Sequence, residues 1–424
     1  MKREICIVGA GPAGLYAALS LAKKGIPSTI VDKAFFPRDK VCGEALTSSV
    51  LRCIQNLNPE ILESQAFKSA KHSIDYLRFF APNHHSVRIP FDSKINQRVG
   101  LESFVSIRRI DLDNVLMDYA KANPLIEVIE GFAVNEVKWL DSGVQVHSNK
   151  REQSLEAQML LIANGYNSKF VKQAGLWEQA DESNACGVTA YYENVSGISD
   201  GKTAECYLLD DLKSGGLYVL PVAKGLVNVN IAMRNDVRKK YKINLRKVLE
   251  ENLKSHPALK ERFKDAIVVQ KPKGHGYHLG VKRRRIIGDR FMLIGDAGGF
   301  NDAISANGIA HAMISAEHAA QALKEAYAQK DFSDASFRAY QKKVYRSFFG
   351  IRWQGILSQP FFIQPKLLFF FVNKLFSYRG AEDLISLAMY KKNPWSLVFD
   401  ATFYKLLFGL KKETIPETGK LLNS

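Results

Sequence analysis

Residues 5 to 14 read Ile-Cys-Ile-Val-Gly-Ala-Gly-Pro-Ala-Gly, an apolar run that leads directly into three glycines. The apolar residues predict a β-strand, and the glycine spacing predicts a tight turn into a helix. In such a turn Gly9 permits the sharp bend, Gly11 lets the backbone approach a pyrophosphate, and Gly14 lets the helix pack close to the strand. The helix N-terminus would offer N–H groups to phosphate oxygens. The stretch therefore predicts a bound dinucleotide.

The residues that follow complete the pattern. Residues 13–24 predict a helix with one apolar face, Gly25 predicts its end, and residues 28–31 predict a second strand that ends at Asp32. An acidic residue about 20 positions after the glycines is placed to accept hydrogen bonds from ribose hydroxyls. The alternative is a strand-to-helix turn that binds nothing, and the complete pattern disfavours it.

Length and composition restrict the class of protein. The 424 residues, 46% of them hydrophobic and 24% charged, predict two or three globular domains. The strand begins at residue 5, so we expect no secretory signal peptide. The five cysteines and nine histidines lack metal-ligand spacing, which predicts no metal site and favours a reducing, cytoplasmic setting. No apolar run reaches the roughly 20 residues that cross a bilayer.

The net charge of +16 is unevenly distributed. Residues 236–285 contain 16 Lys and Arg against 5 Asp and Glu, and residues 331–424 contain 14 against 7. Such charge favours binding to an anionic membrane surface or to a phosphorylated substrate. The alternative is a solvated basic surface that only aids solubility. We expect no nucleic acid partner, because no nucleic-acid motif accompanies the charge. The aromatic, basic residues 361–376 fit a membrane surface, a tunnel for an apolar substrate, or helices packed on the main body.

A second strand-to-helix unit occurs far downstream. Residues 290–299, Arg-Phe-Met-Leu-Ile-Gly-Asp-Ala-Gly-Gly, predict a strand that ends at Gly295-Asp296, and residues 309–323 predict a helix. Between the two units, alternating residues predict antiparallel strands at 185–192, 203–209, 217–220 and 226–233. A parallel nucleotide-binding sheet is thus expected to be interrupted by an antiparallel one.

This arrangement resembles the flavoprotein superfamily of para-hydroxybenzoate hydroxylase. Residues 36–47, Phe-Pro-Arg-Asp-Lys-Val-Cys-Gly-Glu-Ala-Leu-Thr, are similar to the Pro-Arg-x-Lys-x-Cys-Gly segment of its geranylgeranyl reductase branch. The resemblance covers roughly residues 1–330. It implies an α/β fold with a discontinuous Rossmann-like FAD-binding domain (residues 1–75, 100–184 and 285–330). It also implies an inserted antiparallel-sheet substrate domain (76–99 and 185–284), followed by a helical C-terminal region (331–424).

The resemblance also implies FAD as the cofactor and a set of residues that hold it. Residues 109–116 fit the family pattern Arg-x-x-Phe-Asp-x-x-Leu, with leucine in the aromatic position. A helix start at Gly308, aimed at the flavin pyrimidine edge, would stabilise the negative charge of reduced flavin. Asp296 is expected on the ribitol chain, although a turn or capping aspartate is the alternative. The full set is Gly9, Gly11, Ala13 and Gly14 on the pyrophosphate, Asp32 on the ribose, the Val134 backbone on adenine, and Lys33, Lys40, Arg109, Asp296 and Gly308.

Cys42 and Glu44 are the candidate catalytic residues. The reductase branch implies a cysteine close to the flavin. Residues two apart in an extended segment point to the same side, so both side chains are expected to face one pocket. Glu44 would act as an acid there if burial raised its pKa. The alternative is a small buried cysteine beside a surface glutamate.

The expected pocket wall departs from the family. The reductase signature Tyr-x-Trp-x-Phe-Pro falls on residues 216–221, Gly-Leu-Tyr-Val-Leu-Pro, where only the proline is kept. Asn164 replaces the aspartate of an Asp-Gly pair, and Ala303 replaces a proline near the last motif. Flavin halogenases carry Trp-x-Trp-x-Ile-Pro at this wall, so halogenation is not expected. Tyr218, Leu220 and Pro221 are predicted to line a pocket whose substrate these changes leave open.

Three functions follow from these observations. The first is an FAD-dependent oxidoreductase that reduces carbon–carbon double bonds of a prenyl or other lipid-like apolar substrate by hydride transfer from reduced flavin. The alternatives are an FAD-dependent monooxygenase acting on an aromatic or polyketide-like substrate, and a flavin electron carrier to a membrane quinone. No second GxGxxG motif is present, so an external nicotinamide nucleotide or reduced carrier is expected as electron donor. The expected location is cytoplasmic, peripheral to the inner face of the membrane.

Overall fold

A computed structural model of the protein describes residues 3–349, apart from 92–99, 167, 169, 172–175, 177–183, 199–200, 281–282 and 302–307. The expectations for residues 361–376 and Ala303 fall outside these described residues, as does most of the C-terminal region predicted to be helical. Of that region, α11 (Asp334–Ser347) is described and is a helix. No helix among the described residues has the length and apolar character needed to span a membrane.

The first sheet contains the predicted glycine turn. Its parallel strands lie in the order β18, β11, β1, β2, β8, and β1 is the strand that precedes the three glycines. The side chains of Ile5, Cys6 and Ile7 have no exposed surface, which explains their continuous apolar pattern, because a central parallel strand is covered on both faces. The bounds are β1 (Arg3–Val8), β2 (Ser28–Val31), β8 (Ile126–Ile129), β11 (Gln153–Ile162) and β18 (Phe291–Leu293). Antiparallel strands β9 (Glu136–Leu140), β10 (Gly143–Ser148) and β17 (Ile287–Gly288) extend this sheet.

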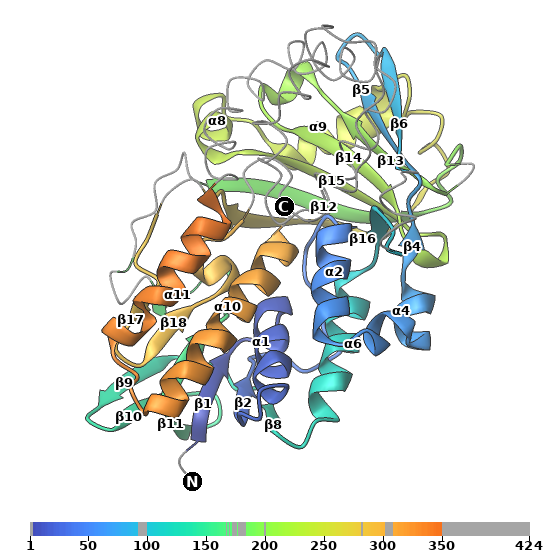
Figure 1. Ribbon diagram of the computed structural model, residues 1–424. Coiled ribbons are helices and arrows are strands. Elements are labelled where there is room, and N and C mark those ends of the chain that lie inside the picture. The colour runs from blue at the N-terminus through green and yellow to red at the C-terminus, as the bar shows by residue number, and fades with distance from the viewer. Residues whose placement is uncertain are drawn as a thin grey trace, which may run out of the picture.

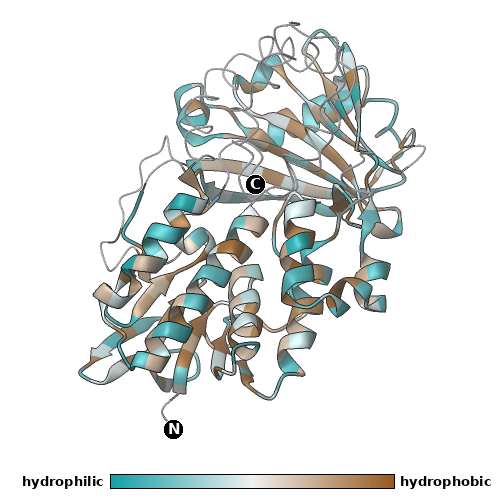
Figure 2. Cartoon of the chain, viewed as in Figure 1, coloured by the Kyte–Doolittle hydropathy of each residue, from teal (hydrophilic) through white to brown (hydrophobic). Residues whose placement is uncertain are grey.

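Helices cover this sheet on the side that faces the viewer in Figure 1. These are α1 (Pro12–Ala22), α6 (Arg109–Lys121) and α10 (Gly308–Gln329). Figure 2 shows mostly hydrophobic residues on the strands and a mixture on the helices, as expected when helices turn one face to the core and one to water. The expected Rossmann-like unit is therefore present.

The second sheet contains the four predicted antiparallel strands. They form β12 (Asn184–Glu193), β13 (Thr203–Tyr207), β14 (Gly216–Pro221) and β15 (Val227–Arg234). The order is β16, β12, β15, β14, β13, β5, β6, and only the β13–β5 pair is parallel. The edge strand β16 (Ile267–His278) was not predicted, because Pro272, Gly274 and Gly276 interrupt its pattern. The remaining pair is β5 (Tyr76–Phe80) and β6 (Ser86–Pro90).

The two faces of the second sheet have different partners. Helix α9 (Leu245–Ser255) packs on one face, where Leu217, Val219 and Leu249 share an apolar core. Since successive side chains of a strand alternate between faces, Tyr218 and Asn228 belong to the opposite face. That face meets the first unit, as the hydrogen bond from the Asn228 amide to the carbonyl of Cys42 shows (3.3 Å). We call it the inner face.

A small third sheet lies between the two larger ones. It consists of β3 (Ala45–Thr47), β7 (Phe104–Ser106) and β4 (His72–Ser73). Helix α2 (Ser48–Leu57) continues directly from β3, so the segment of Cys42 and Glu44 leads into it. The other described elements are α3 (Glu60–Glu63), α4 (Gln65–Ala70), α8 (Asn235–Lys240), η2 (Asp210–Leu212), η3 (Ala223–Gly225) and η4 (Gly295–Gly298).

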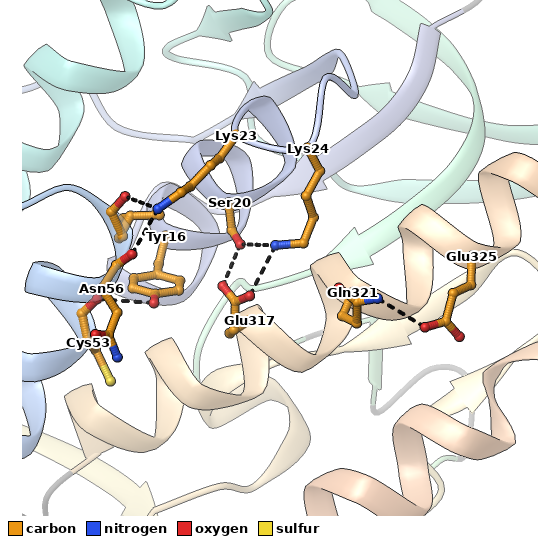
Figure 3. Close-up of polar contacts among 10 residues, drawn as sticks. Tyr16, Ser20, Lys23, Lys24, Cys53, Asn56, Glu317, Gln321 and Glu325 are labelled. Atoms are coloured by element: carbon orange, nitrogen blue, oxygen red, sulfur yellow. Dashed lines mark hydrogen bonds and ion pairs between the residues drawn. The ribbon is translucent and has the colours of Figure 1, made fainter.

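Polar contacts join the helices of the two strand-to-helix units. Figure 3 shows Glu317 of α10 accepting hydrogen bonds from Ser20 of α1 (2.5 Å) and from Lys24, which follows the end of α1 (3.0 Å). One helical turn before Ser20, the Tyr16 hydroxyl donates to the Cys53 carbonyl of α2 (3.1 Å). Two motifs almost 300 residues apart in the chain are thus held against one another.

Candidate active site

The glycine turn is shaped as its sequence predicts. Gly9 has a φ of +108°, and a Cβ there would lie 2.6 Å from the Ala163 carbonyl oxygen. A Cβ on Gly14 would lie 1.9 Å from the Gly9 carbonyl oxygen, so close helix packing requires glycine. At Gly11 the nearest described atom to such a Cβ, Nη2 of Arg38, is 3.8 Å away. Gly11 therefore leaves open space at the start of α1, where a phosphate would approach.

Asp32 is buried at the end of β2 and holds the same turn. Its Oδ2 accepts a hydrogen bond from the Ala10 N–H (2.7 Å), and its Oδ1 accepts one from the Ala34 N–H (2.8 Å). Each carboxylate oxygen has a second lone pair, so a ribose hydroxyl is still able to bind. Lys33 is exposed beside it, and Val134 is half-buried against the main core.

Arg109, at the start of α6, forms a buried ion pair beside the turn. Its guanidinium donates two hydrogen bonds to Asp113, at 2.8 and 2.7 Å. Burial alone lowers the pKa of Arg109, but the charge and hydrogen bonds of Asp113 outweigh it and hold the pKa above its ordinary value. Arg38 also contacts Asp113 (3.2 Å) and donates to the Ala10 carbonyl (3.3 Å). Two arginines share one carboxylate, which leaves net positive charge next to the open side of the turn.

Sequence reasoning missed Arg38 and Asp113 as parts of this site. Arg38 belongs to the quoted Pro-Arg segment, but nothing in that segment shows that it reaches the glycine turn. Asp113 lies four residues after Arg109 on one helix, and this spacing is a usable signal for an ion pair.

Lys40, Asp296 and Arg109 come together from three distant segments. Burial raises the pKa of Asp296, and the charges of Lys40 and Arg109 oppose that rise. The Lys40 side chain is exposed, yet desolvation by the surrounding protein lowers its pKa, and Arg109 lowers it further. We call the surroundings of Lys40, Asp296 and Arg109 the recess, because Lys40 is accessible there although it is desolvated. Gly308 begins α10, whose first turn contains no acidic residue.

Cys42 is half-buried at this recess, and Glu44 has no exposed surface. Glu44 has a φ of +62°, so the segment is not extended and the expected same-side geometry is absent. Burial raises the pKa of Glu44 to about 8, against the opposing effects of Tyr191 and Arg109. Burial and the nearby Glu44 carboxylate raise the pKa of the Cys42 thiol as well. The pair is thus a half-buried cysteine next to a fully buried acid.

The three residues predicted to line the pocket have different surroundings. Tyr218 is 37% exposed on the inner face, although desolvation raises its pKa well above 10. Leu220 is buried in a small apolar core with Ile74 and Phe91, and Pro221 is buried, with its carbonyl accepting a hydrogen bond from Ser106 (2.6 Å). Of the three side chains, only that of Tyr218 is open to a substrate.

Beyond Tyr218 the inner face is polar and aromatic. A Cβ on Gly187 would lie 2.8 Å from Cε1 of His275, so this imidazole lies directly over the glycine. Burial lowers the pKa of His275 to about 4, which keeps the ring neutral near pH 7. The ring stacks on Tyr277, with 5.8 Å between centroids. Asn230 donates a hydrogen bond to Thr189 on the same face.

The chain is similar to known proteins over most of its length. A family model described as an FAD binding domain matches residues 2–343. The digeranylgeranylglycerophospholipid reductase of Thermoplasma acidophilum is 25% identical over 349 residues, which are 81% of this chain and 84% of that protein. The 1H-pyrrole-2-carbonyl-(peptidyl-carrier protein) chlorinase of Pseudomonas fluorescens is 25% identical over 362 residues, 80% of each chain.

The fold is also found among solved structures. A geranylgeranyl bacteriochlorophyll reductase-like protein of Thermoplasma acidophilum has a TM-score of 0.74 and 20% identity, over 100% of this chain and 98% of that chain. The expected α/β fold class is confirmed.

Proposed function

This chain belongs to the FAD binding domain family and is an FAD-dependent oxidoreductase, and on that premise we propose that it reduces a carbon–carbon double bond of a prenyl or other lipid-like apolar substrate. The reduction adds a hydride and a proton across the bond. Bound FAD supplies the hydride chemistry. The residues of this chain bind the cofactor, orient the substrate, exclude water and supply the proton.

The glycine turn and its neighbours fit FAD. The open space at Gly11, the positive charge of Arg109 and Arg38, and the start of α1 suit a pyrophosphate. We assign Asp32 to the ribose, and Lys40 and Asp296 to the part of the cofactor that reaches the recess. Lys33, Ala13 and the Val134 backbone keep their expected roles as proposals, as does the α10 start at Gly308.

The observation that carries the proposal is the fully buried Glu44 carboxyl next to Cys42. With a pKa of about 8, Glu44 is largely a neutral carboxylic acid near pH 7. Its neighbour Cys42 is the member of the pair with accessible surface, and the same recess contains Lys40. Double-bond reduction needs an acid at the reacting carbon, and this chain keeps one neutral beside the expected cofactor position.

The nature of the substrate is inferred from the relatives and the charge. The reductase of Thermoplasma acidophilum is named for a phospholipid with geranylgeranyl chains. The net positive charge of residues 236–285 suits an anionic headgroup or membrane face. We propose peripheral binding at the inner face of the cytoplasmic membrane, with an external nicotinamide nucleotide or reduced carrier as electron donor.

A second candidate is an FAD-dependent monooxygenase of an aromatic substrate, and the inner face favours it. Tyr218, His275 and Tyr277 give the wall aromatic rings and neutral polar groups. One relative is named for a pyrrole substrate. Halogenation remains unexpected, because the wall residues 216–221 lack the Trp-x-Trp-x-Ile-Pro motif.

Oxygen dependence separates the candidates. The FAD-loaded protein would be reduced with dithionite and mixed, in separate reactions, with a geranylgeranyl phospholipid, a phenol or a quinone, with and without air. Reoxidation of the flavin by the lipid under anaerobic conditions supports the reductase. Lipid or phenol oxidation that needs air supports the monooxygenase. Rapid quinone reduction with no chemical change in any lipid supports the electron carrier and contradicts both other functions.

A further inference from the structure

We propose that Tyr191 and Asn228, on the inner face of the second sheet, are positioning residues that hold Cys42 and Glu44 ready for proton delivery. The inference rests on the proposed function only for the destination of the proton. The contacts themselves are independent of the substrate.

A closed set of hydrogen bonds links the four residues. The Tyr191 hydroxyl donates to Oε1 of Glu44. The Asn228 amide donates to the Cys42 carbonyl (3.3 Å) and also hydrogen-bonds the Tyr191 hydroxyl. The Glu44 N–H hydrogen-bonds the Cys42 sulfur. Glu44, Asn228 and Tyr191 are 0%, 1% and 3% exposed, so water competes little with these bonds.

The backbone of Glu44 shows why it needs this support. Its left-handed conformation is unfavourable for a residue other than glycine and persists where the surroundings fix it. The Ile107 N–H holds the Glu44 carbonyl (3.0 Å), and Tyr191 holds its side chain. Oε2 of Glu44 has no hydrogen-bond partner among the described residues, so it is the oxygen that would carry the acidic proton.

The proton step balances within these residues. As the π bond of the substrate breaks, one carbon would receive the hydride that reduced FAD supplies when bound, and the other carbon would form a C–H bond with the proton of Cys42, whose S–H bond breaks and leaves a thiolate. The O–H bond of Glu44 then breaks and its proton restores the thiol. Burial raises the pKa of both groups, and the hydrogen bond between the Glu44 N–H and the Cys42 sulfur keeps the two residues adjacent for this transfer. The Glu44 carboxylate recovers its proton from solvent between turnovers.

Tyr191 acts on this step through Glu44. Its donated hydrogen bond stabilises the carboxylate and so lowers the pKa of Glu44, opposing burial. The other titratable or charged groups that face Glu44 are Arg109 on α6 and Cys42 and Asp39 in its own segment. Removing the Tyr191 hydroxyl should raise the pKa of Glu44 by about one unit, the equivalent of one hydrogen bond.

The FAD-loaded protein is treated with iodoacetamide, and peptide mass spectrometry measures the rate at which Cys42 is alkylated. This rate reports the coupling of Tyr191 and Glu44 to Cys42 without any substrate. Above about pH 8 the ionised Glu44 suppresses thiolate formation at Cys42. Glu44→Gln should therefore speed alkylation several-fold at about pH 8.5. Tyr191→Phe should do the same by keeping Glu44 protonated, and Asn228→Ala should act in the same direction more weakly. None of the three should change the rate much at about pH 6.5.

A double variant and a matched control decide the outcome. If Tyr191 acts through Glu44, adding Tyr191→Phe to Glu44→Gln should change nothing further. Tyr192→Phe removes a buried hydroxyl from the opposite face of the same strand and should leave alkylation unchanged. Equal acceleration at both pH values, or full additivity in the double variant, would show general loosening and overturn the proposal. If alkylation behaves as expected but no lipid is reduced, only the proposed reaction fails.

Discussion

Glu44 is a carboxylic acid that the fold keeps protonated well above its ordinary range. Its pKa of about 8 in the folded chain exceeds its ordinary value of 4.5, because the side chain is fully buried. In the unfolded chain the group ionises at its ordinary pKa. Between these two values the folded state binds the extra proton, so the contribution of Glu44 to stability falls as the pH rises.

We therefore expect the free energy of unfolding to decrease between about pH 5 and about pH 8, and Glu44→Gln to flatten that slope. Urea unfolding of both proteins at several pH values measures it. Glu63→Gln, an exposed glutamate paired with Lys68, is the control and should keep the wild-type slope. A slope that is unchanged in Glu44→Gln would contradict the buried acid.

Tyr218 and Leu220 lie two residues apart on β14 but should respond differently to substitution. Tyr218 is accessible, so Tyr218→Ala should raise KM for the substrate while FAD affinity and stability change little. Leu220 is buried in an apolar core, so Leu220→Ala should cost about 2–5 kcal/mol of stability. Steady-state kinetics and urea unfolding measure the two effects. A large loss of stability in Tyr218→Ala would show that Tyr218 belongs to the core and not to the pocket wall.

At the scale of elements, the strand, the glycine turn and α1 form one unit with two separable functions. A Cβ at Gly14 meets the backbone of Gly9 at 1.9 Å, whereas a Cβ at Gly11 meets nothing closer than 3.8 Å among the described atoms. Gly14 therefore serves helix packing, and Gly11 serves the approach of a ligand.

Alanine at these two positions should separate folding from cofactor binding. Gly11→Ala should leave the thermal stability of the apoprotein close to wild type and weaken FAD binding at least tenfold, about 1.4 kcal/mol. Gly14→Ala should reduce both. Differential scanning fluorimetry of apoprotein and titration of flavin fluorescence provide the two readouts. Equal FAD affinity in Gly11→Ala and wild type would place the pyrophosphate elsewhere.

The helices and strands differ in how well the sequence predicts them. The parallel strands and α1 follow from continuous apolar runs, and β12 to β15 follow from alternation. Strand β16 escapes prediction because an edge strand tolerates the proline and glycines that suggest a loop. Glu44 adopts a left-handed backbone that its residue type does not suggest, so the same-side argument for Cys42 and Glu44 was wrong in geometry.

At the scale of the whole molecule, the candidate site forms where distant segments meet. Tyr191 contacts Glu44 across 147 positions, and Asn228 contacts Cys42 across 186. No local pattern encodes such pairs, so sequence reasoning found the thiol and the acid but not the residues that hold them. The glycines, Asp32, Arg109 and Asp296 could be proposed because their motifs are local. The surroundings of Lys40, by contrast, could be recognised only in the assembled fold.

We propose that this oxidoreductase adds a hydride and a proton to a carbon–carbon double bond of a lipid. Mass spectrometry of a geranylgeranyl phospholipid, incubated anaerobically with the FAD-loaded protein and excess dithionite, tests it most directly. We expect a lipid heavier by two hydrogen atoms for each reduced bond, with Glu44→Gln and Cys42→Ala much slower. A lipid of unchanged mass, or a product that gains an oxygen atom only in air, would contradict it.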